Sequence, residues 1–225
     1  MWILAVAAVA GLVTLGLMLA EVGPFEPEIE LPPAPFDPDR YDQEPEPLVL
    51  SDIAATTTHP PDGVETYIPL NMVDDDPTTA WRSDGTRFPG GVGETIDLFL
   101  AEPVWVDAVV IANGFQRDAE AYTASARVKR ALVTFDGGVR FVINLLDEGR
   151  QLQIVELDEP MLTTSVRVEI METFPGTNGE DVAVSDIELR GRTADADDAA
   201  LARERAELLP GAGRGVVMEP PAAWG

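Results

Sequence analysis

The amino-acid sequence predicts an all-β fold, an antiparallel β-sandwich or jelly roll, over residues 48–192 of the 225-residue chain. Short segments in this region alternate apolar and polar residues with a period of two, as strands with one buried face do. Gly, Pro and Asp turns separate these segments, and no long helical period interrupts them. A region of about 145 residues is large enough to bury a two-sheet core.

The alternation is clearest in TIDLFL, RFVINLL and SVRVEI, which begin at Thr95, Arg140 and Ser165. The stretch VWVDAVVIANG, from Val104, is more continuously apolar and predicts a central strand with both faces covered. The turn FDGG at 135–138 predicts a hairpin that joins RALVTF to RFVINLL. Together these segments outline the predicted sandwich.

The first 22 residues predict a transmembrane helix or signal anchor. Residues 2–20 carry no charge and, as a helix, span about 28 Å, close to the hydrocarbon thickness of a bilayer. A cleaved signal peptide is the alternative, but no basic segment precedes the apolar run and the site before Glu21 is a poor cleavage site. The simplest topology is a single-pass protein of the cell membrane whose folded domain is extracytoplasmic, either periplasmic or at the cell surface.

Residues 23–47 predict an extended linker, because proline removes backbone donors and like charges repel. The linker is either a plain spacer or a strap laid along a partner protein. Residues 193–225 predict a tail with one short helix, which begins at Thr193 or Asp195 and ends at Pro210 and Gly211. The large apolar residues predicted to contact a partner in these two segments are Phe25, Phe36, Tyr41, Val217 and Trp224.

The composition excludes several classes of function. Forty acidic residues and fifteen basic residues give a formal net charge of −25, so the chain should be repelled by nucleic acid. The charge favours basic proteins or divalent cations as partners, or it only maintains solubility. The chain has no cysteine and one histidine, His59, and it shows no Ser-His-Asp set and no phosphate-binding loop. These residues therefore give no basis for predicting a catalytic site of those types.

The stretch NMVDDDPTTAW at 71–81 resembles the opening signature of discoidin-like domains, also called coagulation-factor type C or galactose-binding-like domains. Four later segments resemble, in the same order, the bacterial branch found as a glycan-binding domain beside NAD glycohydrolases. They are VVIANGF, AYTASARVKRALVTFDGG, the Pro175-Gly176 turn and the closing VSDIELRG. The resemblance covers residues 48–192 and leaves out the anchor, the linker and the tail.

This resemblance implies a jelly-roll β-sandwich that binds a ligand without catalysis. It also implies one structural calcium ion, because Asp74, Asp76 and Thr79 stand at the family's ligand positions and Asp186 replaces its late glutamate. Asp75 stands where the family has a glycine. The alternative is a turn in which the carboxylates cap backbone amides without a metal ion.

Family members often bind sugars or lipids through loops at one end of the sandwich. Sugar sites usually combine an exposed aromatic ring with an arginine, an amide or an acid, and the candidates here are Phe88, Phe115, Arg117 and Tyr122. The alternative is that Phe88 and Phe115 fold back onto the core.

We predict a non-enzymatic, membrane-anchored protein that serves as an accessory subunit of a larger membrane protein complex and docks through its sandwich and extended termini. The second hypothesis is a cell-surface glycan-binding module. An open cleft with an aromatic lining would favour the glycan module, and termini ordered on another chain would favour the subunit.

Overall fold

The computed structural model describes residues 32–208 except 64 and 178. The strands are β1 (Glu46–Pro47), β2 (Leu50–Ala55), β3 (Trp81–Arg82), β4 (Thr95–Asn113), β5 (Arg127–Phe135), β6 (Arg140–Asn144), β7 (Leu152–Phe174) and β8 (Ala183–Thr193). The helices are α2 (Ala119–Ala124) and α3 (Ala196–Leu208), and the 3-10 turns are η1 (Pro38–Arg40), η2 (Pro69–Met72), η3 (Pro89–Gly91) and η4 (Asp136–Gly138).

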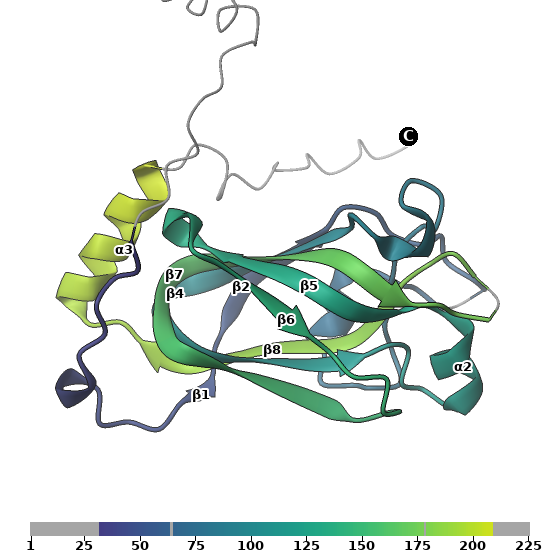
Figure 1. Cartoon of the computed structure of the whole chain (residues 1–225), viewed down its shortest axis with the longest axis horizontal. Coiled ribbons are helices and arrows are strands. Elements are labelled where there is room, and N and C mark those ends of the chain that lie inside the picture. The colour runs from purple at the N-terminus through teal and green to yellow at the C-terminus, as the bar shows by residue number, and fades with distance from the viewer. Residues whose placement is uncertain (1–31, 64, 178, 209–225) are drawn as a thin grey trace, which may run out of the picture.

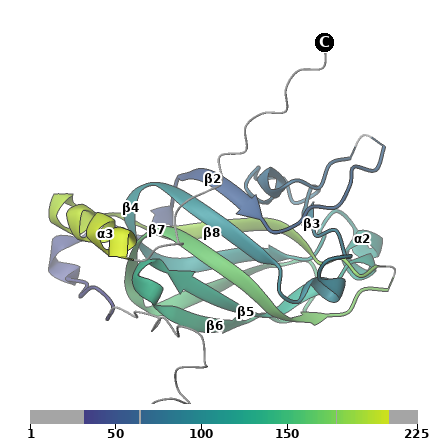
Figure 2. The same cartoon turned by 90° about the horizontal axis from the view of Figure 1, so that it is seen from above.

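Two long strands, β4 and β7, connect the two layers of the sandwich. Residues 96–100 of β4 pair with β2, and residues 95–99 pair with residues 165–169 of β7. Further along β4, residues 104–113 pair with β8, and residues 104–112 pair with residues 152–163 of β7. The hydrogen-bonded order is β1-β8-β4-β7-β5-β6, with β2 on β4 and β3 on β8, and the pairs are antiparallel. Both long strands curve at the end of the sandwich next to α3 (Figures 1 and 2).

This arrangement confirms the predicted all-β antiparallel fold. TIDLFL and VWVDAVVIANG were expected as separate strands, but they are the two halves of β4, because the strand continues through the curve instead of ending there. The predicted central strand pairs with both β7 and β8. The predicted FDGG hairpin is also confirmed, since η4 joins β5 to β6 and Gly137 adopts a φ of 84° that a side chain would strain.

The core lies between the two layers and follows the alternation read from the sequence. Ile96, Leu98, Ile143, Val166 and Val168 are all buried in one apolar cluster. Trp81 is fully buried in the same cluster, and its indole N–H donates a hydrogen bond to the Thr57 carbonyl at 2.9 Å. The tryptophan that follows the acidic turn therefore anchors that turn to the core.

The end of the sandwich where β4 and β7 curve is covered by the chain itself. Phe36 and Tyr41 place their rings 5.0 and 6.2 Å from the ring of the fully buried Trp105. The Tyr41 hydroxyl donates to Asp198 of α3 at 2.7 Å, and Asp195 caps the helix by accepting from the Asp198 amide at 3.0 Å. α3 is the short helix expected in the tail, with Asp195 as the N-cap.

Phe36 and Tyr41 were expected to contact a partner protein, and in this structure they pack within the chain instead. Trp105 explains the difference, because so large a ring at the curve needs an apolar cover. Phe25, Val217 and Trp224 lie outside the described residues, so their partner contacts stay a prediction.

The predicted membrane anchor at 1–22 also lies outside the described residues. Across residues 32–208, apart from the two gaps, no helix is long and apolar enough to cross a membrane. The anchor and the extracytoplasmic location therefore stay predictions.

Candidate functional site

The candidate site is built on the acidic turn between η2 and β3. One carboxylate oxygen of Asp74 accepts from the Asp76 amide at 2.9 Å, and the other accepts from the Thr79 hydroxyl at 2.8 Å. The Asp76 carboxylate accepts from the Thr78 amide at 2.9 Å. Asp75, at the position where the family has glycine, adopts a φ of 58°, which aspartate tolerates better than most residues.

Ser185 of β8 ties this turn to the segment that follows β4. Its hydroxyl donates to the Thr79 carbonyl at 2.8 Å and accepts from the Gln116 amide at 2.9 Å. The next residue, Asp186, is half-buried beside the turn. Burial, with smaller contributions from the negative charges of Asp75, Glu188 and Asp74, raises the pKa of Asp186 to about 6.

The placement of these side chains gives no support to the calcium ion implied by the resemblance. Among the described residues, no three His, Asp or Glu side chains form a group that could hold a metal ion. The carboxylates of Asp74 and Asp76 accept hydrogen bonds from the turn itself. The geometry is that of a capped turn, and calcium binding by Asp74, Asp76, Thr79 and Asp186 stays a prediction for titration to test.

A hollow of about 320 Å³ opens beside the turn, and we call it the charged hollow. Its lining consists of Asp75, Pro77, Val110, Ala112, Gln116, Arg150, Leu152, Asp186, Glu188 and Arg190. A second hollow of about 250 Å³ adjoins it and shares Asp75, Asp186 and Glu188. The acidic turn and β8 therefore contribute to both.

Contacts hold the polar groups of the charged hollow in place. The Arg190 guanidinium donates to Glu188 at 2.6 Å, and the Arg150 guanidinium donates to the Gln116 and Arg117 carbonyls at 3.2 Å each. Val110 and Ala112 are almost completely buried among these groups. The lining thus combines donors and acceptors with small apolar side chains.

The predicted ligand residues lie next to this hollow. Phe115 is buried, its ring lies 4.6 Å below the Arg117 guanidinium carbon, and it packs edge-on to Tyr67. Arg117 also forms an ion pair with Glu65 at 2.6 Å. The structure therefore brings Phe115 and Arg117 together, and Gln116 between them lines the charged hollow.

Tyr122 and Phe88 belong to other local assemblies. The buried Tyr122 donates to Asp147 at 2.9 Å and lies against Gly114, where a Cβ would come within 3.0 Å of the tyrosine ring. Phe88 is half-buried, and its ring covers Gly93. The burial of Phe115 matches the alternative that its ring folds back onto the core, and Tyr122 is buried as well, while ligand binding by these residues stays a prediction.

Sequence reasoning missed most of the charged hollow. One signal was available, because the alternation in SDIELR puts Asp186, Glu188 and Arg190 on the face of β8 opposite the buried Ile187 and Leu189. No pattern in the sequence pairs this face with Arg150, which lies in the loop before β7.

Comparison with known proteins identifies the family. The model of the NAD glycohydrolase translocation F5/8 type C domain matches residues 44–190. The chain belongs to this family. The match confirms the predicted resemblance to coagulation-factor type C, or discoidin-like, domains. A search of curated proteins found no match.

Solved structures resemble this member of the F5/8 type C family at low identity. The family 32 carbohydrate-binding module of Clostridium perfringens NanJ, solved in complex with galactose, is 12% identical with a TM-score of 0.45 over 62% of this chain and 92% of that chain. The arabinofuranosyltransferase AftD from Mycobacteria is 23% identical with a TM-score of 0.50 over 63% of this chain and 11% of that chain. At these identities the likeness concerns the fold alone.

Proposed function

We propose that this F5/8 type C domain is a non-catalytic binding module that holds a carbohydrate in the charged hollow. The observation that carries the proposal is the lining, in which guanidinium, amide and carboxylate groups surround the apolar side chains of Val110, Ala112 and Leu152. The solved carbohydrate-binding module in complex with galactose is consistent with this class of ligand.

A sugar ring presents hydroxyl groups around its edge and an apolar C–H face. Arg150 and Arg190 supply donors, and Asp75 and Glu188 supply acceptors, so both sides of a hydroxyl can be satisfied. Leu152 is exposed and offers the apolar contact for the C–H face, whereas Val110 and Ala112 are almost completely buried beneath the surface. A few fixed polar groups around an apolar surface are the usual construction of a small-molecule site.

The charge of the lining selects among sugars. Three carboxylates and two guanidinium groups line the hollow, so neutral or amine-bearing sugars should bind better than uronic or phosphorylated sugars. Because the pKa of Asp186 is about 6, its charge increases as the pH rises through that value. The affinity for an amine-bearing sugar should therefore rise from acidic to neutral pH.

A glycan array followed by titration of the best ligand tests this proposal. We expect Arg190→Ala to weaken binding about tenfold or more, the loss typical of a hydrogen bond to a charged group. Arg167→Ala is the matched control, because Arg167 is another strand arginine in a surface ion pair, with Asp97 at 2.6 Å, and does not line the hollow. An array without ligands, or equal affinity in both variants, would contradict the proposal.

We also propose that the module is anchored in the cell membrane with its domain outside. The support is the uncharged run at 2–20 and the absence of a good cleavage site before Glu21. N-terminal sequencing of the mature protein should find Met1 or Trp2. A mature chain that starts at Glu21 or later would show that the run is a cleaved signal peptide.

An accessory-subunit role is the second candidate function. It is favoured by an apolar opening in the wall of the sandwich, which is separate from the charged hollow and is described below. A subunit of a membrane complex and a glycan-binding module are compatible roles, because the two surfaces have no lining residue in common.

A further inference from the structure

Two strand edges on one side of the sandwich have no strand beside them in the described part of the chain. β6 pairs with β5 alone. In the first half of β7, residues 152–156 and Met161 pair with β4 alone, and residues 157–160 lie at a shift in register where no partner is paired with them among the described residues. A free edge presents a row of backbone N–H and C=O groups that can pair with another strand.

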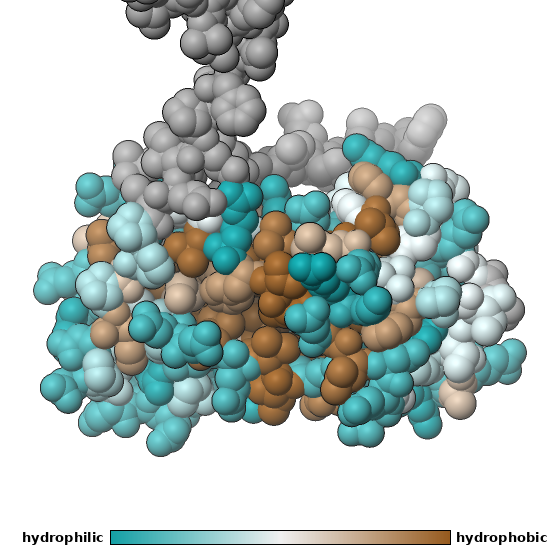
Figure 3. Space-filling model, in the orientation of Figure 1, coloured by the Kyte–Doolittle hydropathy of each residue, from teal (hydrophilic) through white to brown (hydrophobic). Residues whose placement is uncertain are grey.

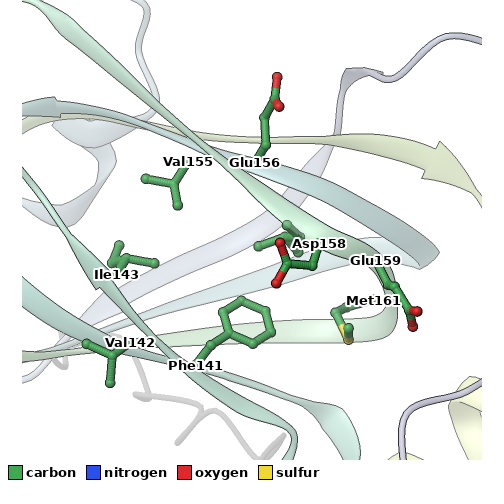
Figure 4. A pocket seen from close by; sticks show the side chains of 9 residues that line it. Phe141, Val142, Ile143, Val155, Glu156, Asp158, Glu159 and Met161 are labelled. Carbon is green, nitrogen blue, oxygen red and sulfur yellow. The ribbon is translucent and has the colours of Figure 1, made fainter.

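A hollow of about 320 Å³ lies between these two edges, and we call it the edge hollow. It is lined by Phe141, Val142, Ile143, Val155, Glu156, Leu157, Asp158, Glu159 and Met161. Figure 4 shows Phe141 and Ile143 on one side and Val155 and Met161 on the other. Figure 3 shows apolar side chains gathered on this face of the molecule, over β6 and β7.

The edge hollow exposes part of the core. Phe141, Val155, Leu157 and Met161 pack against the main apolar cluster but remain half-buried. By contrast, Trp105 at the curved end is completely covered by Phe36, Tyr41 and α3. The described chain closes its apolar surface at one place and leaves it open at the other.

One end of the gap already shows how an added strand would bond. The Gln153 side chain accepts from the Leu146 amide at 2.7 Å and donates to the Leu146 carbonyl at 2.9 Å. A side-chain amide thus satisfies both backbone groups of a residue just beyond β6, as the peptide group of a neighbouring strand would. Further along β7, from Val155 to Met161, the apolar hollow takes the place of such a bridge.

The charge of the hollow indicates the chemistry of its occupant. Its lining includes the carboxylates of Glu156, Asp158 and Glu159, and no lysine or arginine from the described part of the chain. In Figure 4, Asp158 lies beside the apolar side chains. A segment that carried acidic side chains here would be repelled, whereas basic side chains would be attracted.

We propose that the edge hollow is the docking site for an extended segment of a partner protein in which apolar and basic residues alternate. The segment pairs as an added strand with the free edge of β7 at residues 152–159. Its apolar side chains enter the hollow between Phe141 and Leu157, and its basic side chains face the carboxylates. Strand addition of this kind takes affinity from backbone hydrogen bonds and specificity from alternate side chains.

A capped ten-residue peptide of alternating valine and lysine, added to the full chain, tests this proposal. We expect binding, together with slower hydrogen exchange of backbone amides within residues 152–159. An alternating valine and glutamate peptide should bind at least about tenfold more weakly. Asp158→Lys should weaken binding of the lysine peptide, while Asp62→Lys, the same charge change at an exposed loop residue that does not line the hollow, should not.

The other possible results of this experiment would show that the edge hollow binds no peptide or that it is occupied by another segment. No binding, or equal loss in both lysine variants, would overturn the proposal and show only a general attraction to the acidic chain. If residues 152–159 are already protected without peptide, two controls apply. Protection that disappears on truncation after Leu208 would assign the hollow to the chain's own tail, and protection that grows with protein concentration would assign it to a second copy.

Discussion

The charged hollow and the edge hollow have the same volume, about 320 Å³ each, but different linings. The charged hollow carries guanidinium, amide and carboxylate groups on the outer face of β8 and β4. The edge hollow is an opening into the core, with apolar side chains and carboxylates only. Volume therefore does not distinguish them, and the chemistry of the lining does.

The comparison indicates that one small sandwich can offer sites for two classes of ligand. Donors and acceptors fixed around a small apolar floor suit a polyhydroxylated ring. An unpaired strand edge over exposed core suits an extended polypeptide. The first site depends on side chains from several loops and strands. The second depends on the edges of β6 and β7 that have no partner strand among the described residues.

The largest expected effect concerns the stability contributed by a buried residue in the lining of each hollow, Ile143 in the edge hollow and Val110 in the charged hollow. Ile143 lies in the main core cluster, so Ile143→Ala should lower the free energy of unfolding by about 2–5 kcal/mol. Val110 is buried on the outer face, outside that cluster, so Val110→Ala should cost only about 1.5 kcal/mol. Urea denaturation of both variants measures the difference. Equal losses in the free energy of unfolding would mean that Ile143 and Val110 belong to the same core.

The next effect concerns the charge of Asp186. Its pKa in the folded chain, about 6, lies above its ordinary value of 3.8, so the folded state binds this proton more tightly than the unfolded state. The resulting stabilisation is fully present below about pH 4 and is lost as the pH rises through about 6. Asp186→Asn should therefore be more stable than the natural chain near neutral pH, by about 1 kcal/mol after allowance for solvent screening.

Melting curves of the natural chain and of Asp186→Asn, recorded at low pH and near neutral pH, check this expectation. At about pH 2.5, well below the ordinary pKa of 3.8, the natural chain and Asp186→Asn should melt together, because the carboxyl is then largely protonated in both the folded and the unfolded state. A variant that is less stable near neutral pH would show that the negative charge of Asp186 has a favourable partner at the charged hollow.

The smallest expected effect concerns calcium. We expect millimolar calcium and a chelator to give the same melting temperature, because the Asp74 and Asp76 carboxylates are engaged within the turn. A calcium concentration about 100 times the dissociation constant of a real site would add about 2.7 kcal/mol and raise the melting temperature by a few degrees. A rise of that size would contradict our expectation and support the calcium site implied by the family resemblance.

Much of the fold could be predicted from the sequence, because period-two alternation records which face of each strand is buried. Ile96, Leu98, Val166 and Val168 were placed in the core on that basis, and they are buried. The continuity of β4 could not be predicted, because Glu102 and Pro103 look like a break and only pairing with β7 and β8 carries the strand past them.

The candidate site was harder to predict, because it depends on contacts between distant segments. The aromatic residues Phe115 and Tyr122 were candidates for a sugar site, but Arg117 and Arg127 lie over their rings. The charged hollow combines Arg150 with Arg190, and no local pattern brings these two together. The edge hollow depends on strand edges that have no partner strand among the described residues, and the strand pairing of the folded chain is needed to find them.

The central claim is that the two hollows bind different ligands, and a backbone-amide NMR titration of the full chain tests it most directly. The best glycan from an array is added first, and the alternating valine and lysine peptide is added second. We predict that the glycan shifts amides near Gln116, Arg150 and Asp186–Arg190, and that the peptide then shifts amides of β6 and of residues 152–159. Glycan shifts that fall on β6 and residues 155–159, or peptide shifts that fall around Gln116 and Arg190, would contradict the claim.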